Sequence, residues 1–348
     1  MKWRARNLLL RLALALLVPT VGLSGLCRAG LAQEPAEPAL SPGEITPKTQ
    51  LAIEKGLAHL AQTQRADGSW TYSGSGGHVG ITSLAGIAFL AGGNLPGRGQ
   101  YGANVDRATD YVLQQVRRDG YISAGNSRMY SHGFAALFLA EVYGMTARDD
   151  VKTKLKRAIR LIESCQNHEG GWRYNPQPFD ADISVTICQI MALRAARNAG
   201  IKVDKSVIDR GILYVKSCQN ADGGFSYQAR QSGSGFARTS AGVCSLYYAG
   251  AYGDPAIGKG LAYLRKNSQL SSRNNYHFHY GHYYAVQAMF QAGGESWKTY
   301  YTAIREHLVR SQAENGSWSG GPTKGAYATA MSCIILEVPY QYLPILQR

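Results

Sequence analysis

Gln64-Arg-Ala-Asp-Gly-Ser-Trp70 is the first of four closely similar heptapeptides in this chain of 348 residues. The others are Gln166-Asn-His-Glu-Gly-Gly-Trp172, Gln219-Asn-Ala-Asp-Gly-Gly-Phe225 and Gln312-Ala-Glu-Asn-Gly-Ser-Trp318, with a degenerate copy in Gln115-Val-Arg-Arg-Asp-Gly-Tyr121. Their aromatic residues are 51, 51, 53 and 93 residues apart, so a sixth copy is expected near 270–276. Self-similarity at a fixed period indicates a repeat architecture.

Each copy separates two segments of helical character. The segment before it is amphipathic, with apolar residues at helical spacing, as at 53, 57 and 60. The glycine of the motif supplies the left-handed turn that ends this first helix. The segment after it is rich in small residues, and its six copies cover residues 82–90, 131–139, 184–193, 240–246, 281–289 and 329–336.

Two concentric rings of helices satisfy both patterns. Amphipathic first helices have one wet side and fit an outer ring, whereas helices rich in small residues pack closely on several sides and fit an inner ring. An open solenoid is the alternative, but it needs polar end caps, and the last helix is almost entirely apolar. The sequence therefore predicts an all-α protein, an (α/α)6 toroid of six helical-hairpin repeats over residues 49–348.

The N-terminus has the pattern of a secretory signal peptide. A basic start is followed by the apolar run Leu8–Val18, and small residues precede a cleavage point after Ala32. A lipoprotein processed at Cys27 and a retained signal anchor are the alternatives. We expect residues 1–32 to be a signal peptide, residues 33–48 to be a flexible linker, and the protein to be exported or periplasmic, with membrane contact only through the signal peptide.

Charge and cysteine content narrow the function classes. Without residues 1–32 the chain has 32 basic and 23 acidic residues, a net charge of +9, which favours solubility and attraction to anionic surfaces. Export and the lack of any nucleic-acid-binding motif disfavour a nucleic-acid partner. The five remaining cysteines occupy positions equivalent between repeats, and we expect them to be buried small residues rather than disulfides.

The heptapeptide followed by a small-residue helix resembles the repeat of squalene-hopene cyclases and of protein prenyltransferase β subunits. The resemblance covers residues 50–336. It implies an (α/α)6 toroid with a central cavity, and it does not by itself assign an activity. We expect the glutamine and the aromatic residue of each motif to tie the end of one outer helix to its neighbour.

Alignment of the inner helices on their first hydroxyl residue predicts a polar ring at one mouth of the cavity. Two positions before that hydroxyl stand Met129, Asp182, Arg238, His279 and Tyr327. Asp180 and His277 lie two residues further out. The same alignment places only small residues, three of them cysteines, four positions after the hydroxyl, where inner helices would pack.

Asp182 is the candidate catalytic residue, with Asp180 beside it. The segment Phe179-Asp-Ala-Asp-Ile-Ser184 resembles the Asp-x-Asp-Asp-Thr motif of class II terpene cyclases, in which a carboxylic acid protonates an alkene or epoxide. Asp182 falls on the proton-donating position, and Ile183 stands where that motif has its second aspartate. The alternative interpretation is an Asp182–Arg238 ion pair between adjacent inner helices, which would lower the pKa of Asp182.

Three histidines, His277, His279 and His282, fall within six residues. The catalytic zinc ligands of prenyltransferases have no counterparts here, because Tyr280, His282 and Ala328 stand at their positions. A different metal site, with His279 and His282 joined by Asp182, is an alternative. The simpler expectation is a polar and aromatic cavity wall without a cofactor.

These observations leave three functions open. The first is an exported toroid that binds an apolar, isoprenoid- or lipid-like molecule in its cavity. The second is a class II terpene-cyclase-type enzyme that uses Asp182 as general acid. The third is a non-catalytic scaffold with a protein partner, similar to the toroid domains of complement-type proteins.

Overall fold

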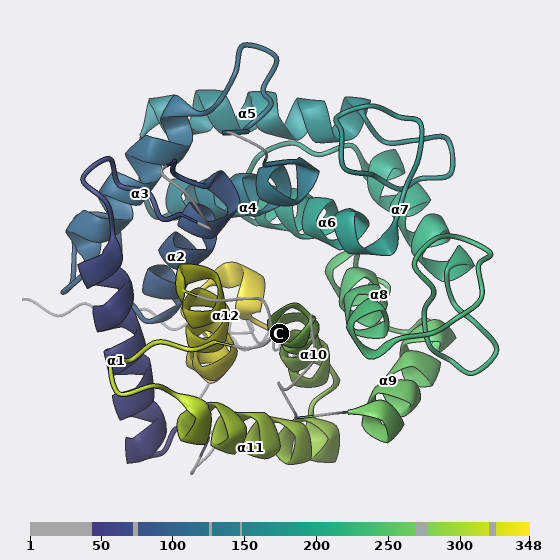
Figure 1. The fold of residues 1–348 in the computed structure, drawn as a ribbon. Coiled ribbons are helices and arrows are strands. Elements are labelled where there is room, and N and C mark those ends of the chain that lie inside the picture. Colours follow the sequence, from purple (N-terminus) through teal and green to yellow (C-terminus); the bar gives the residue numbers. More distant parts are fainter. Residues whose placement is uncertain are drawn as a thin grey trace, which may run out of the picture. The chain divides into compact units, whose positions relative to one another are not determined.

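The computed structural model describes residues 44–348 except for 72–75, 125–126, 147, 269, 271–276 and 320–324. Within these residues the secondary structure consists of twelve α-helices and two short 3-10 helices, with no strand. Helical hairpins follow one another along the chain and close into a ring (Figure 1). The all-α toroid predicted from the repeats is therefore confirmed.

Six helices form the outer ring and six the inner ring, in strict alternation (Figure 1). The outer helices are α1 Pro47–Thr63, α3 Gly102–Gln114, α5 Asp149–Ser164, α7 Lys205–Ser217, α9 Pro255–Asn267 and α11 Gly294–Ser311. The inner helices are α2 Val79–Ala91, α4 Met129–Met145, α6 Ile183–Asn198, α8 Phe236–Tyr248, α10 Phe278–Ala292 and α12 Gly325–Glu337.

Small residues let the inner helices approach one another closely. All thirteen residues of α2 are buried, whereas α5 buries only one stripe of five residues. A Cβ atom on Gly86 would lie 2.4 Å from the ring of Phe138, and one on Gly133 would lie 2.7 Å from the Cβ atom of Cys188. The sequence bias toward small residues thus reflects packing between neighbouring inner helices.

In four of the six repeats, the motif glutamine links an outer helix to the next. Gln64 Nε2 donates to the carbonyl of Gly68 in its own turn and to that of Asn104 in α3, both at 3.0 Å. The same pair of bonds is made by Gln166, Gln219 and Gln312. Gln312 reaches the carbonyl of Ala52 in α1, so the last repeat is bonded to the first and the ring is closed.

The motif aromatic residue joins an outer helix to an inner one. Trp70 Nε1 donates to the Leu60 carbonyl at 3.0 Å, and its backbone N–H donates to the Thr82 hydroxyl of α2 at 3.1 Å. Trp172 and Trp318 make both bonds, and Phe225 makes the backbone bond. These four aromatic residues are staples, as expected, and they also fasten the starts of α2, α6, α8 and α12.

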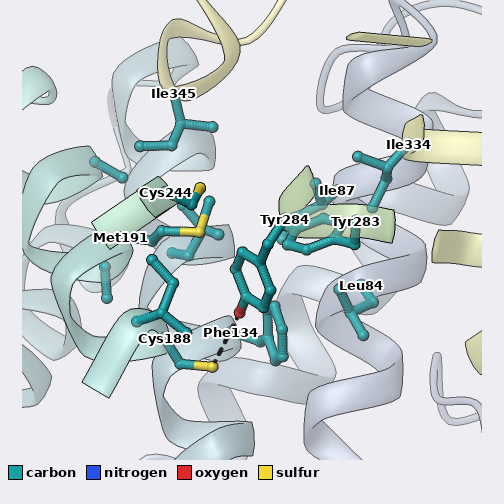
Figure 2. Close-up of a cluster of buried hydrophobic side chains, with 14 of the residues drawn as sticks. Leu84, Ile87, Phe134, Cys188, Met191, Cys244, Tyr283, Tyr284, Ile334 and Ile345 are labelled. Atoms are coloured by element: carbon teal, nitrogen blue, oxygen red, sulfur yellow. Dashed lines mark hydrogen bonds between the residues drawn. The ribbon is translucent and has the colours of Figure 1, made fainter. Parts of the chain in front are cut away.

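The middle of the ring is packed rather than open. Figure 2 shows Tyr283 and Tyr284 of α10 at its centre, with the Cys188 thiol 3.2 Å from the Tyr284 hydroxyl. Ile345, in the 3-10 helix η2 (Pro344–Leu346), packs near the carboxyl ends of the inner helices and is 2% exposed. The amino ends of the same helices line a cavity instead.

Several sequence predictions concern the ends of the chain. The predicted signal peptide, most of the linker and the decayed motif copy at 271–276 lie outside the described residues. Helix α1 begins at Pro47 with Thr46 as its N-cap, two residues before the predicted start of the toroid. The five cysteines of the described part are buried and unbridged. Nowhere in the described chain is a helix both long and apolar enough to cross a membrane.

Candidate functional site

A cavity of about 830 Å³ opens among the amino ends of the inner helices. Each of the six helices contributes to its wall from its first six residues. Its apolar lining includes Ile81, Leu84, Phe134 and Phe236. Below them lie the buried tyrosines of α10, with the ring of Phe134 edge-on to that of Tyr283 at 6.0 Å. The inner part of the cavity is therefore aliphatic and aromatic.

Hydroxyl and nitrogen groups surround the outer part of the cavity. Its tyrosines come from three inner helices and two loops, and they are Tyr130, Tyr174, Tyr227, Tyr280 and Tyr327. His78, His277 and Arg238 add the nitrogen groups. An apolar pocket with a few polar groups at one end is the usual form of a small-molecule site.

Hydrogen bonds establish the register of the inner helices and correct the predicted alignment. In four repeats the backbone N–H of the motif aromatic residue donates to a threonine hydroxyl of the next inner helix. The pairs are Trp70–Thr82, Trp172–Thr186, Phe225–Thr239 and Trp318–Thr329. The sequence alignment had used Ser184 and Ser240 in place of Thr186 and Thr239. In the second repeat His132 accepts the equivalent bond, from the N–H of Ile122, where the alignment had used Ser131. Three of the six helices were thus displaced by one or two residues.

The predicted ring was formed by the residues two positions before the aligned hydroxyl residues. In the corrected register, the residues two positions before the hydrogen-bonding residues do line the cavity. They are Gly80, Tyr130, Ser184, Ala237 and Tyr327. His279 of α10 is the exception, because it is 2% exposed and its ring lies edge-on to Phe278. Met129 is fully buried, its carbonyl accepts a bond from Gln189 Nε2 at 2.9 Å, and it does not line the cavity.

Asp182 is the N-cap of α6. Its Oδ1 accepts hydrogen bonds from the backbone N–H groups of Ser184 and Val185, both at 2.9 Å. Its own N–H donates to the carbonyl of Trp172, just as His78 donates to Trp70 in the first repeat. Asp182 is therefore equivalent to His78, and the structure gives it a local role in starting its helix.

The cation beside Asp182 is Arg173, which corrects the predicted Asp182–Arg238 ion pair. Arg173 Nε lies 3.6 Å from Asp182 Oδ2 and 3.5 Å from Asp180 Oδ2. Asp180 is half exposed and accepts a bond from Gln228 Nε2 at 2.9 Å. Arg238 lines the cavity and forms no ion pair with either aspartate among the described residues.

Burial raises the pKa of Asp182 to about 6. The N–H of Val185, the charge of Arg173 and the N–H of Ser184 lower the pKa, but they do not outweigh the loss of hydration. Oδ2 is buried and makes no hydrogen bond. The side chain is fully buried and does not line the cavity. The lowered pKa that the alternative Asp182–Arg238 ion pair implied is therefore not found, because burial of the carboxyl group outweighs the nearby positive charge.

Two tyrosines stand at the cavity wall next to Asp182. The hydroxyls of Tyr174 and Tyr227 are hydrogen-bonded to each other, and Tyr227 is close enough to Asp182 to lower its pKa. The Arg173 guanidinium lies 4.7 Å from the ring centroid of Tyr174 and 5.3 Å from that of Tyr227. The carboxyl group thus lies behind a tyrosine wall that a cavity ligand would contact first.

The three histidines of residues 277–282 lie in different surroundings. His277 lines the cavity, whereas His282 is fully buried and its Nδ1 lies 2.6 Å from the Tyr300 hydroxyl of α11. Burial, and next the charge of His307, lowers the pKa of His279 to about 4. The described part of the chain contains no group of three or more histidine, cysteine or carboxylate side chains placed to hold a metal ion. His279, His282 and Asp182 are not brought together.

Two cavity tyrosines missed by sequence reasoning follow a simple rule. Tyr174 and Tyr227 each lie two residues after a motif aromatic residue. Aligning the repeats on that aromatic residue, rather than on the next hydroxyl, would have placed both at the same mouth.

Residues 100–335 match the family model of the prenyltransferase alpha-alpha toroid domain. The chain belongs to this family. Its sequence has no match among curated proteins. The toroid thus has a family, and the activity of this member has to be inferred from its site.

Solved structures show the same fold at low sequence identity. A variant of the type II terpene cyclase MstE from Scytonema, in complex with its substrate geranylgeranyl dihydroxybenzoate, is 15% identical, with a TM-score of 0.61 over 85% of this chain and 98% of that chain. An inactive α-1,6-mannanase variant from Salegentibacter, in complex with α-1,6-mannotriose, is 7% identical, with a TM-score of 0.64 over 83% and 98%. A protein from Actinoplanes is 16% identical, with a TM-score of 0.59 over 84% and 99%.

Proposed function

We propose that this toroid binds an apolar, isoprenoid- or lipid-like molecule in the cavity at the amino ends of its inner helices. The observation that carries the proposal is the wall of that cavity, which is apolar inside and rich in hydroxyl groups outside. An amphiphile would place its chain against Leu84 and Phe134 and its polar end among the tyrosines. Each buried methylene group contributes about 0.8 kcal/mol to such binding.

The size of the cavity supports a ligand of this class. About 830 Å³ lies within the range of roughly 300–1,000 Å³ that is typical of small-molecule sites. MstE, which shares the fold, was solved with a geranylgeranyl substrate. The mannanase, which also shares the fold, was solved with a sugar, so the fold alone does not select the ligand.

The proposal includes export. Residues 1–32 have the basic start, apolar run and small residues of a cleaved signal peptide, and the Pro- and Glu-rich residues 33–48 suit a linker. A mass of the secreted protein that corresponds to a start at Gln33 would support export. Retention of the whole chain in the cytoplasm would contradict it.

Co-purified lipid is the direct test of binding. We expect mass spectrometry of an organic extract of the purified protein to show a lipid at close to one molecule per chain. Ala237→Phe, which fills part of the cavity wall, should remove that lipid. Ala103→Phe, the same change on the exposed side of α3, should retain it. Equal loss or equal retention in both variants would contradict binding in this cavity.

A class II cyclase is the second candidate, and the state of Asp182 favours it. A buried carboxyl group with a pKa of about 6 and an oxygen without a hydrogen bond can be protonated near neutral pH, as a general acid requires. Asp182→Asn would then abolish cyclised product from a polyprenyl substrate while lipid binding persists. A protein that yields no product before the substitution, yet holds lipid, is a binder.

The third candidate, a protein-interaction scaffold, has a different signature. A scaffold would purify without lipid, and its partner binding would be indifferent to Ala237→Phe. The hydroxyl-rich cavity wall is unnecessary for such a role, which is why we rank ligand binding first.

A further inference from the structure

Among the described residues, the cavity wall has one permanent positive charge and no negative one. Arg238 is the only lysine or arginine of the described lining residues, and none of them is aspartate or glutamate. Asp182 lies behind the wall and its nearest cation is Arg173. A ligand that enters this cavity therefore meets a cationic group that no carboxylate in the wall neutralises.

Arg238 has no acidic partner in the described chain. Among the ion pairs within 4.0 Å, the carboxylates bond to other cations, such as Arg173, Arg148 and Lys216. The internal segments outside the described residues contain no aspartate or glutamate. The positive charge of Arg238 is thus available to a ligand.

The position of Arg238 along its helix adds to this imbalance. It is the third residue of α8, and its guanidinium lies against the N-cap residue, Gly235. Cations are disfavoured at helix amino ends, where the peptide dipoles already place partial positive charge. None of the six inner helices has an acidic residue in its first turn. A bound anion would relieve the repulsion between Arg238 and the dipole of α8.

We propose that the cavity ligand is an amphiphilic carboxylate, with its head group held by Arg238 and its apolar chain directed toward Leu84 and Phe134. This inference rests on the proposed lipid-binding function and specifies the head group. The planar guanidinium can donate two parallel hydrogen bonds to a carboxylate. Tyr327 and His277 also line the cavity.

The amount of positive charge favours a carboxylate over a diphosphate. The one permanent cation of the described wall balances a head group with one negative charge. A diphosphate carries two or more charges and would need further cations, which the described lining residues do not supply. His78 adds no such charge near neutral pH, because burial lowers its pKa.

Ligands that share the oleyl chain and differ in the head group test this inference. The purified, delipidated chain would be titrated with oleic acid, oleyl alcohol and oleyl phosphate, and with acetate as a head group without a chain. We expect oleate to bind at least about tenfold more tightly than oleyl alcohol, and acetate to bind far more weakly than either. Arg238→Gln should weaken oleate binding by about 10- to 100-fold and leave oleyl alcohol unchanged. Arg230→Gln is the matched control, because Arg230 is 76% exposed, pairs with Glu169 and does not line the cavity.

The outcomes separate this inference from the proposed function. Equal binding of oleate and oleyl alcohol would overturn the carboxylate inference and leave lipid binding intact. Tighter binding of oleyl phosphate than of oleate would overturn the choice of a carboxylate. Acetate that competes as well as oleate would show a site for small anions rather than for an amphiphile. If neither long-chain compound binds, the proposed function itself fails.

Discussion

The two ends of the inner ring are built from the same six helices, yet one is hollow and the other is packed. At the amino ends the wall holds Arg238 and no carboxylate, and the space is open. At the carboxyl ends Ile345 packs near the helix ends, and two carboxyl groups, those of Glu141 and Glu337, are buried. The pKa of both glutamates is raised by burial, so neither behaves as an ordinary surface acid.

The difference indicates that the two ends of the ring have different roles. The packed end is expected to contribute more to stability, because the buried residues of η2 pack against α6 there. The hollow end holds the hydroxyl groups of the cavity tyrosines and the guanidinium of Arg238, which forms no ion pair among the described residues. Stability and binding are therefore expected to respond to substitutions at opposite ends.

The largest expected effect comes from the packed end. Ile345→Ala should lower the free energy of unfolding by about 2–5 kcal/mol, because it leaves a cavity in a closed core. Phe236→Ala at the hollow end should lower the free energy of unfolding by about 1–2 kcal/mol, since the Phe236 ring already borders open space. Urea unfolding of both variants measures the contrast. A larger loss for Phe236→Ala would reverse the assignment of the two ends.

Glu141 should make stability depend on pH. Burial raises its pKa to about 8 from an ordinary value of 4.5, so the folded protein prefers the protonated form. The contribution of Glu141 to the free energy of unfolding is complete below about pH 4.5, where the group is protonated in both the folded and the unfolded state. This contribution is lost as the pH rises toward 8. Between pH 5 and pH 8 the free energy of unfolding of Glu141→Gln should therefore rise relative to that of the parent by on the order of 2–4 kcal/mol. Thermal unfolding of both proteins across this pH range measures the effect. A difference in unfolding temperature that stays constant with pH would refute the prediction.

Asp182 should behave mainly as an N-cap. Asp182→Ala should cost about 1–2 kcal/mol, because two backbone N–H groups of α6 lose their acceptor. Asp182→Asn keeps an acceptor oxygen and should stay within about 0.5 kcal/mol of the parent. Differential scanning calorimetry of both variants decides the point. Equal destabilisation by Asn and Ala would show that the negative charge matters more than the cap.

The smallest expected effect concerns Arg238 without ligand. Arg238→Gln should raise the stability of the delipidated protein by about 0.3–1 kcal/mol, since it removes a cation from the amino end of α8. Saturation with oleate should reverse the order and make the parent the more stable protein. A variant less stable than the parent in the absence of ligand would indicate that Arg238 has a structural role.

Reading the sequence recovered the repeats, the helix classes and the closure, but only part of the site. Arg238, His277 and Tyr327 line the cavity, whereas Met129, His279 and His282 lie within helix packing. The cation next to Asp182 is Arg173, one residue after a motif tryptophan, and no periodicity in the inner helices points to it. Long-range pairs of this kind depend on loops whose path a repeat pattern leaves open.

By itself the sequence determined that helical hairpins of about 51 residues recur and close, because glycine, small residues and apolar spacing act locally. Tertiary structure alone decided which residues face the cavity. The loop between the motif aromatic residue and its hydroxyl partner spans 11, 12 or 14 residues, so counting along the chain misaligns the inner helices. The hydrogen bond across that loop determines the register, and a shift of one residue rotates a helix by about 100°.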